Sequence, residues 1–524
     1  MWNNSGDCWQ KKETTTTETS ASGPILAAAI DVGSNAMRLH IAGPDAEAGL
    51  KTIHYHRESV RLGHDAFTRG RLSEETMEKA LQAFEIFRSM IDLHPVQTIR
   101  AVGTSALRDS VNASELIRRI KDKTGIEIEI ISGEEEARLI HLSVHHRVPD
   151  MDKMRTLLID IGGGSIEITL AKHGDIVALE SFSMGTVRLL ELFRDASGNA
   201  EKPKIMNEYI ASMQQKVREE MAGMRIDFCI GTGGNIEALD ELGVSLLGND
   251  SNHQLSYKDI RKLLKHLQSM SYEDRIDQIG LRPDRADVII PAAIALKSIV
   301  KLARPAALLI PSAGLADGVL LDLLQEQNTG SKVLAHQAIA WARSMARKYH
   351  ADVSHARHVR ILARKLFSQL KDIHQLNDRD LLLLQVSAIV HEIGITVRPN
   401  KHHRHAFYLI NASPMVGLSS SEKKLVALVV RYHRKRTPDT DNEPFSELTK
   451  AQQKRVFRLN VLLRLAIALD KERRGNVRAI HISRSGKISR LQVEGKGDLL
   501  LERWAVRKEA PWFETVFDHR LEIA

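Results

Sequence analysis

Two matching loops, far apart in the sequence, constrain this chain more than any other feature. The first follows the apolar residues 27–30 and reads Asp31-Val32-Gly33-Ser34. The second follows the apolar residues 156–159 and reads Asp160-Ile161-Gly162-Gly163-Gly164-Ser165. Glycine has no Cβ, so backbone N–H groups in such a turn can approach a phosphate, and the aspartate can hold a divalent cation against it. Two copies in one chain therefore predict two phosphate loops that face each other.

The chain between residues 25 and 328 alternates strands and helices, and one plan occurs twice. The pattern begins at Ile25 and restarts after a linker near residues 148–152. In each copy an apolar strand runs into a glycine loop and a second strand follows, so we expect two α/β halves. The predicted strands are 25–32, 38–42, 98–103, 127–131, 156–161, 166–171, 176–183, 228–230 and 307–311, and the predicted helices include 73–93, 113–124 and 134–144.

The rest of the chain has a different pattern. From residue 332 to Asp470 it is dominantly helical, and short strands follow. Residues 327–332 form the best linker, and the Thr-rich residues 1–24 have no apolar period. The sequence thus predicts a multidomain α/β and α protein with a disordered tail at 1–24, α/β domains at 25–150 and 151–328, an all-helical domain at 329–474 and a small α+β domain at 475–524.

The charge of the chain is distributed unevenly. Residues 331–524 carry about 36 lysines and arginines against about 19 acidic residues, whereas the remainder is net acidic. A basic C-terminal part suggests a polyanionic partner, although a solvated basic face gives the same composition. Nucleic acid is not expected, because aromatic residues make up only 5% of the chain and do not interleave with basic ones.

The sequence favours a cytoplasmic protein. Its two cysteines cannot form a disulfide framework, and the N-terminal residues lack the apolar core of a secretory signal. Charges interrupt the longest apolar stretches before they reach the ~20 residues that a membrane span requires. We therefore expect no integral membrane segment.

Acidic and basic side chains accompany the predicted loops. Asp31, Asp160 and Glu167 offer oxygen ligands of the kind that Mg²⁺ accepts. The glutamates at 134–136 open a helix after a Ser-Gly turn, where they either favour the helix dipole or include a general base for water. Periodicity does not say which of them would be the base. Arg108 follows a strand end, and its planar fork suits phosphate oxygens.

Five segments occur in one order, at residues 31–35, 103–108, 131–139, 160–167 and 231–235. Together they resemble the exopolyphosphatase/guanosine pentaphosphate phosphatase family, within the superfamily of acetate and sugar kinases, heat-shock chaperones and actin. The Ser-Gly-Glu-Glu-Glu-Ala-Arg-Leu segment is the most selective, since the superfamily shares the glycine turn. The resemblance implies two actin-like (ribonuclease H-like) domains that face a cleft.

The same resemblance implies metal-dependent transfer of a terminal phosphate to water. It assigns the water-activating base to Glu136 and a Mg²⁺ or Mn²⁺ ion to Asp160 and Glu167, with Asp31 as a further ligand. K⁺ is a further candidate cofactor, and a homodimer is expected from the family alone. The implied phosphate-binding residues are Ser34, Asn35, Arg108, Gly163, Gly164 and Ser165.

Histidines are spread through the helical part in an order that resembles the HD family of metal-dependent phosphohydrolases. They include His355 and His391, with Asp470 later in the chain. The doublet typical of that family is His-Asp, whereas this chain has His391-Glu392. The sequence therefore favours an HD-like helical fold whose histidines pack, or bind phosphate, without a metal.

Basic residues in the helical part predict a groove for a long polyphosphate, whose binding would depend on salt. We therefore expect inorganic polyphosphate as the substrate. The alternatives are a guanosine pentaphosphate hydrolase, a protein that binds guanosine penta- or tetraphosphate, a kinase relative and an HD-type phosphodiesterase. The predicted groove residues are His402, His403, Arg431, His433, Arg434, Lys435 and Arg436.

Overall fold

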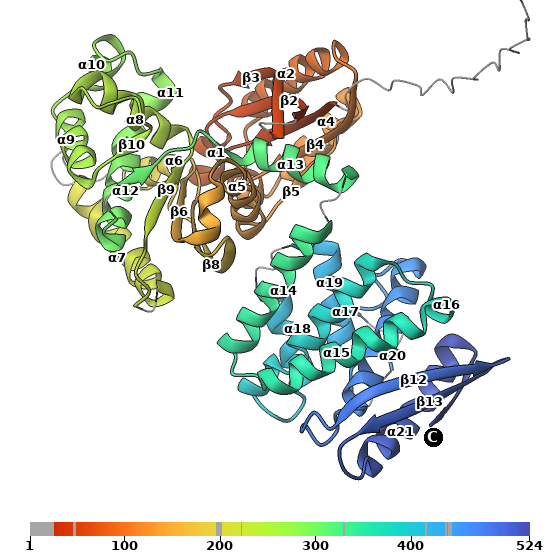
Figure 1. The fold of residues 1–524 in the computed structure, drawn as a ribbon. Coiled ribbons are helices and arrows are strands. Elements are labelled where there is room, and N and C mark those ends of the chain that lie inside the picture. Colours follow the sequence, from red (N-terminus) through yellow and green to blue (C-terminus); the bar gives the residue numbers. More distant parts are fainter. Residues whose placement is uncertain are drawn as a thin grey trace, which may run out of the picture.

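The computed structural model describes residues 26–45, 49–194, 202–221, 223–305, 307–328, 331–413, 417–434, 437–438 and 443–523. The predicted tail at 1–24 lies outside these residues. Figure 1 shows two α/β parts side by side, followed by a helical part and a small sheet near the C-terminus. The predicted mixed α/β architecture is therefore confirmed.

The first sheet has the strand order β3-β2-β1-β4-β5. Every residue of β1 is buried, because this strand lies in the middle of the sheet. Strands β2 and β3 continue from it as an antiparallel meander, and β4 lies parallel on its other side. The strands are β1 (Leu26–Val32), β2 (Met37–Asp45), β3 (Gly49–Glu58), β4 (Val96–Gly103) and β5 (Ile128–Ile130).

The second sheet repeats this plan, with the order β10-β11-β9-β6-β7-β8. Strand β6 corresponds to β1, the antiparallel strands β7 and β8 to the meander, and the parallel strand β9 to β4. The two predicted α/β halves of one plan are thus present. The strands are β6 (Arg155–Ile161), β7 (Ile166–Lys172), β8 (Asp175–Phe182), β9 (Phe228–Thr232), β10 (Gln254–Leu255) and β11 (Leu308–Leu309).

Helices cover both sheets. Helix α2 begins after Ser73, whose side chain accepts a hydrogen bond from the N–H of Thr76. The helices of the two α/β parts are α1 (Leu62–Arg69), α2 (Glu74–Asp92), α3 (Ser105–Asp109), α4 (Ala113–Thr124), α5 (Gly133–Arg147), α6 (Thr186–Leu192), α7 (Lys202–Met221), α8 (Gly234–Leu247), α9 (Tyr257–Gln268), α10 (Tyr272–Asp277), α11 (Pro283–Ala286), α12 (Ile289–Ala303) and α13 (Leu315–Asn328).

The two halves exchange a helix. Helix α5 follows the first sheet in the chain but packs against β7 and β8, whereas α13 follows the second sheet but packs against β1 and β2. The two helices also pack on each other at Gly318, where a Cβ would lie 2.0 Å from the carbonyl oxygen of Leu139. Only glycine allows this close crossing, which fixes α5 between the sheets.

The helical part has one continuous apolar core that extends into the small C-terminal sheet. That sheet has the order β12-β13-β14, and α21 packs on it. The elements are α14 (Ser331–Lys348), α15 (Val353–Gln369), α16 (Lys371–His374), α17 (Asp378–Val390), α18 (His402–Ala412), α19 (Ser420–Arg431), α20 (Lys450–Ala468), β12 (Val477–Ser485), β13 (Ile488–Gly495), α21 (Leu500–Phe517) and β14 (Arg520–Ile523).

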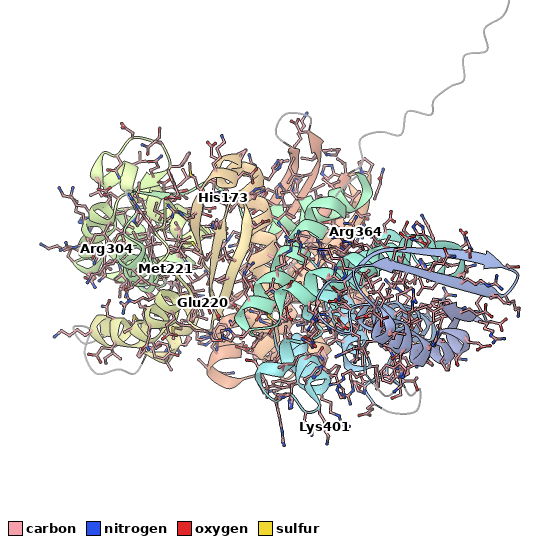
Figure 2. The ribbon with its side chains drawn as sticks, turned by 60° about the horizontal axis from the view of Figure 1, so that its bottom comes forward. His173, Glu220, Met221, Arg304, Arg364 and Lys401 are labelled. Carbon is pink, nitrogen blue, oxygen red and sulfur yellow. The ribbon has the colours of Figure 1, made fainter. Side chains whose placement is uncertain are left out.

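Helix α14 connects the helical part to the second sheet. The Ser344 hydroxyl donates to the carbonyl oxygen of Val177 in β8 at 3.1 Å. Glu220, at the end of α7 in Figure 2, pairs with Lys348 at 3.6 Å. None of the helices that the structure describes is long and apolar enough to cross a membrane.

Candidate active site

The two glycine loops lie directly against each other at the junction of the sheets. The hydroxyl oxygens of Ser34 and Ser105 are 2.9 Å apart. A Cβ on Gly164 would lie 2.2 Å from the Ser105 oxygen and 2.8 Å from the Ser34 oxygen, and one on Gly163 would lie 3.1 Å from the Cβ of Ser34. Glycine at position 164 is therefore required for the loops to meet.

Four buried carboxyl groups converge on these loops. Burial and then the charge of Glu167 raise the pKa of Glu136 well above its usual value. Burial also raises the pKa of Asp160 to about 6 and, together with the charge of Asp160, raises the pKa of Glu167 to about 8. Burial raises the pKa of Asp31 as well, although Arg38 opposes the shift. Burial, more than mutual repulsion, therefore favours the protonated forms of these acids.

Hydroxyl groups from neighbouring strands hold two of these acids in place. Asp160 and Glu167 are paired across β6 and β7. The Thr232 hydroxyl donates to Asp160 at 2.7 Å, and the Ser181 hydroxyl donates to Oε1 of Glu167 at 2.8 Å. The other oxygen of Glu167 is buried without a partner, which leaves it available to a cation.

The donor set fits a magnesium ion that retains water. Among the described residues, Asp31, Asp160 and Glu167 do not bring three oxygens within 4.8 Å of one another. The carboxylate of Asp31 pairs instead with Arg38 at 2.6 Å. Mg²⁺ is usually bound through one or two carboxylates, several waters and substrate phosphates, so Asp160 and Glu167 suffice for it.

Helix α5 brings Glu136 to the carboxyl cluster. The Ser132 hydroxyl caps the helix by accepting from the N–H of Glu135 at 3.2 Å. The Arg108 guanidinium donates to Glu136 at 3.2 Å and to the carbonyl oxygen of Ile131 at 2.7 Å. The predicted base and the predicted phosphate-binding arginine are thus adjacent.

The structure distinguishes the three glutamates that sequence periodicity left equal. Glu135 turns away and accepts two hydrogen bonds of 2.8 Å from Arg138. Glu134 lies near Lys423 in α19, where its charge opposes the lowering of the Lys423 pKa by burial. Of the three glutamates only Glu136 is buried, and it lies among the acids of the cluster. The helix dipole acts on all three glutamates alike, so it does not explain why their burial and their partners differ.

Ser181 is a site residue that sequence reasoning missed. A Cβ on Gly133, the first residue of α5, would lie 2.2 Å from the Ser181 oxygen. The glycine of the most selective motif therefore lets α5 approach the serine that binds Glu167. Ser181 carries no sequence signal, because it stands alone in an ordinary strand.

Asn35 contacts the opposite half of the molecule instead of pointing into open space. Its side-chain amide donates to the carbonyl oxygen of Asp284 at 2.9 Å and accepts from Arg61 at 3.1 Å. Arg61 pairs with Asp287 at 2.7 Å, and Arg57 pairs with Asp284. These contacts join the first sheet to the segment around α11.

The predicted polyphosphate groove is only partly exposed. His402 and His433 are buried, and burial lowers the pKa of each. His403 is partly buried, and burial also lowers its pKa to about 4. Arg431 stacks over the ring of Phe407 at 4.7 Å. Arg434 is exposed, and Lys435 and Arg436 lie outside the described residues, so the groove stays a prediction.

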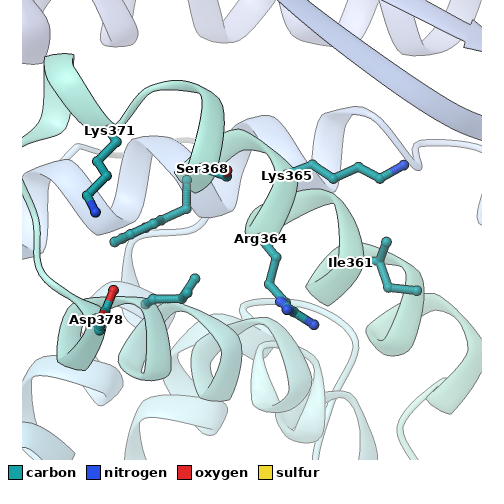
Figure 3. Close-up of a pocket in the computed structure, with 8 residues that line it drawn as sticks. Ile361, Arg364, Lys365, Ser368, Lys371 and Asp378 are labelled. Carbon is teal, nitrogen blue, oxygen red and sulfur yellow. The ribbon is translucent and has the colours of Figure 1, made fainter.

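A basic pocket of about 490 Å³ lies between α15 and α17 (Figure 3). Arg364, Lys365 and Lys371 line it together with the acidic Asp378. Next to it, burial and three like charges lower the pKa of Arg360. These charges belong to Arg343, Arg364 and Arg357. The arginines at 357, 360 and 364 have helical spacing in the sequence.

Comparison with known proteins gives the family. Residues 41–327 match the Ppx/GppA phosphatase family, and residues 340–510 match domain III of Ppx/GppA phosphatases. The chain belongs to the Ppx/GppA phosphatase family, as the motifs indicated. It is a phosphoanhydride hydrolase.

Curated relatives match most of the chain. The guanosine-5'-triphosphate,3'-diphosphate pyrophosphatase of Photobacterium profundum is 28% identical over 443 residues, which are 84% of this chain and 86% of the relative. The protein of that name from Vibrio parahaemolyticus is 28% identical over 450 residues, which are 86% and 87% of the two chains.

Solved structures match a little over half of the chain. An exopolyphosphatase from Cytophaga hutchinsonii has a TM-score of 0.54 and 29% identity, over 57% of this chain and 98% of its own. The Ppx/GppA family member from Aquifex aeolicus has a TM-score of 0.51 and 27% identity, over 58% and 99%.

Proposed function

We propose that this protein is an exopolyphosphatase that hydrolyses the terminal phosphate of inorganic polyphosphate and releases orthophosphate. The observation that carries the proposal is the convergence of four buried carboxyl groups and Arg108 on two touching glycine loops. A terminal phosphate bound at the loops would lie within reach of a base and of positive charge. This arrangement suits phosphoryl transfer, in which positioning and electrostatics do most of the catalysis.

Glu136 is the proposed general base. It would take a proton from a water molecule, whose oxygen then attacks the terminal phosphorus while the bond to the bridging oxygen breaks. The raised pKa of Glu136 makes its carboxylate a stronger base once the positive charge of a bound cation favours loss of its proton. Arg108 would hold Glu136 in the free enzyme and turn to phosphate oxygens when substrate binds.

Asp160 and Glu167 are the proposed ligands of a Mg²⁺ or Mn²⁺ ion. When bound, the ion supplies positive charge against the phosphate oxygens. The unpartnered oxygen of Glu167 and the raised pKa of both acids support this role. Ser34, Gly163 and the loops around them would bind the phosphate through hydroxyl and N–H groups. K⁺ stays an open candidate.

The substrate proposal rests on the basic C-terminal part. Arg343, Arg357 and Arg364 lie close enough to Arg360 to lower its pKa, and such a concentration of positive charge suits a long polyanion. A guanosine pentaphosphate 5'-phosphohydrolase is the second candidate, and the names of the curated relatives favour it. A protein that only binds such nucleotides would not need the base.

The organisation beyond the family match is also a proposal. We propose actin-like domains at 25–150 and 151–328, an HD-like helical domain at 329–474 and a small α+β domain at 475–524. The repeated strand order supports the first two, and the continuous helical core supports the third. A cytoplasmic location and a homodimer are further proposals.

One assay tests the function. Orthophosphate release is measured from long-chain polyphosphate, guanosine pentaphosphate and ATP, each with and without Mg²⁺. We expect the fastest release from polyphosphate and little release after the metal is removed. Faster release from guanosine pentaphosphate would establish the second candidate, and release from ATP alone would contradict both.

A further inference from the structure

Arg188, in α6, contacts three separate parts of the candidate active site at once. Its Nε donates to the carbonyl oxygen of Gly164 at 2.9 Å, and a terminal nitrogen pairs with Asp109 at the end of α3. The guanidinium also lies over the ring of Phe67 in α1, 3.9 Å from the ring centroid. Gly164 belongs to the second α/β half, whereas Asp109 and Phe67 belong to the first. Arg188 therefore joins the two halves beside the glycine loops.

The carbonyl groups of the second glycine loop, at residues 162–164, all accept hydrogen bonds from α6. The first accepts from the N–H of Thr186 at 3.0 Å, and the second accepts from the N–H of Val187 at 2.7 Å. The third, that of Gly164, accepts from the side chain of Arg188. The carbonyl groups of this loop are therefore directed toward α6, and the last of them depends on a side chain that a substitution can remove.

These contacts decide where the N–H groups of the loop point. In a planar trans peptide the carbonyl oxygen and the N–H of the next residue lie on opposite sides of the bond. Because the carbonyl groups of residues 162–164 point toward α6, the N–H groups of residues 163–165 point away from it. Among the described residues, no carbonyl oxygen or side chain accepts from these N–H groups, although Ser165 is only 3% exposed. Buried donors without a partner call for an anionic ligand.

Close packing keeps the peptide of Gly164 in this orientation. A Cβ on Gly185, directly before α6, would lie 2.4 Å from the backbone nitrogen of Gly164 and 2.4 Å from that of Ser165. A Cβ on Gly164 would lie 2.4 Å from the ring of Phe67, which is the ring that Arg188 covers. Any other orientation of the Gly164 peptide would therefore require α6 or Phe67 to move.

The pairing with Asp109 extends the influence of Arg188 to Arg108. These two residues are neighbours at the end of the short helix α3. Arg108 donates to Glu136 at 3.2 Å, so the position of α3 sets the distance between the arginine and the proposed base. Arg188 thus holds the second glycine loop and the helix of the phosphate-binding arginine in fixed relative positions.

Arg194 offers a matched comparison just beyond the end of α6. It has the same charge, and it pairs with Glu191 of that helix at 2.6 Å. Its side chain is 54% exposed, whereas that of Arg188 is 21% exposed. A loss of positive charge near α6 would affect both arginines alike, so the two can be separated by substitution.

We propose that Arg188 is a positioning residue for phosphoryl transfer, which orients the Gly164 peptide so that the N–H of Ser165 donates to the terminal phosphate. Through Asp109 it also holds Arg108 beside that phosphate. This role rests on the proposed function, which places the terminal phosphate at the glycine loops. Lysine cannot replace Arg188, because its ammonium group lacks the planar fork that reaches two acceptors in fixed directions. Oriented N–H groups act on the charge that develops during transfer, so their loss lowers kcat.

The test compares full-length variants in orthophosphate release from long-chain polyphosphate with Mg²⁺ present. Arg188→Gln and Arg188→Lys should each lower kcat about 10–100-fold, because a small misplacement of binding groups has an effect of this size. The KM for a long chain should change little, since one N–H is a small part of its contacts. Arg194→Gln should keep the unmodified rate. The role is overturned if folded Arg188→Lys keeps the unmodified kcat, or if Arg194→Gln loses as much as Arg188→Gln.

A second readout uses the unmodified protein and needs neither a variant nor hydrolysis. Saturating orthophosphate with Mg²⁺ should slow amide hydrogen exchange at residues 163–165, because the phosphate accepts from these N–H groups. Unchanged exchange there would overturn the role of Arg188. Slowed exchange in a protein that does not hydrolyse polyphosphate would contradict the proposed function and leave this role standing, so the two failures are distinguishable.

Discussion

The α/β part and the helical part each bury a cluster of titratable side chains, and the two clusters have opposite chemistry. At the glycine loops the buried groups are carboxylic acids, and burial raises the pKa of Glu167 to about 8. In the helical part they are imidazoles, and burial lowers the pKa of His391 to about 4. Burial favours the neutral form in both places. The difference teaches that the same burial should make the two clusters respond to pH in opposite directions.

The clusters also differ in what holds them. Helix α5, which carries Glu136, is anchored by a buried ion pair of 3.0 Å between Arg138 and Asp322. The histidines are anchored mainly by backbone carbonyl oxygens. Charged supports can be removed by one substitution, whereas backbone supports cannot. The predictions below use this contrast.

Removal of the charged support should have the largest effect on stability. Asp322→Ala leaves the buried Arg138 without one carboxylate and should cost about 3–5 kcal/mol of unfolding free energy. Denaturant unfolding measures the loss. Glu129→Ala serves as the control, because Glu129 is 52% exposed and pairs only at the surface with Arg100. Equal losses in the two variants would contradict the anchoring of α5.

The contact between the glycine loops gives a smaller effect. Gly164→Ala would bring a Cβ within 2.2 Å of the Ser105 oxygen, and overpacking of this kind costs about 1–3 kcal/mol. Gly163→Ala is the matched control, because its nearest contact would be 3.1 Å. The unfolding temperature and the rate of phosphate release should both fall further in Gly164→Ala than in Gly163→Ala. The reverse order would show that the loops are not in contact.

The pH dependence of stability should have opposite signs in the two clusters. Without metal, folded Glu167 binds more protons than the unfolded chain from about pH 4.5 to about 8, so its contribution falls as pH rises. Folded His391 binds fewer protons than the unfolded chain from about pH 4 to 6.5, so its contribution rises with pH.

Two variants separate these contributions. Unfolding free energies are measured from pH 4 to 8 in a chelator. Glu167→Gln should remove part of the decline at higher pH, and His391→Gln should remove part of the rise at lower pH. The same change in slope from both variants would contradict the comparison of the two clusters.

Local sequence signals predicted the strands and loops that form the site. The apolar runs before residues 31 and 160 fix β1 and β6, and the predicted helix 113–124 has the bounds of α4. Strand β3 was missed, because a largely exposed edge strand resembles a polar connection. Ile130 is 41% exposed, because β5 is an edge strand.

Long-range packing decided what the sequence left open. All three glutamates at 134–136 occupy the first turn of α5, and only the contacts of Arg138 and Arg108 separate them. The histidine cluster was expected to be without metal, because its doublet is His-Glu. The hydrogen bond between His355 and Asp470 joins residues 115 positions apart, and no local pattern shows it.

The role of Glu136 is the central claim, and one measurement tests it most directly. Orthophosphate release from long-chain polyphosphate is compared for the unmodified protein and Glu136→Gln, both folded and with Mg²⁺ present. Loss of the base should lower kcat about 10²–10⁴-fold, which is about 2.7–5.4 kcal/mol, with polyphosphate binding retained. Glu134→Gln, which removes a neighbouring glutamate from outside the cluster, should stay near the unmodified rate. A folded Glu136→Gln enzyme with near-normal turnover would contradict the account.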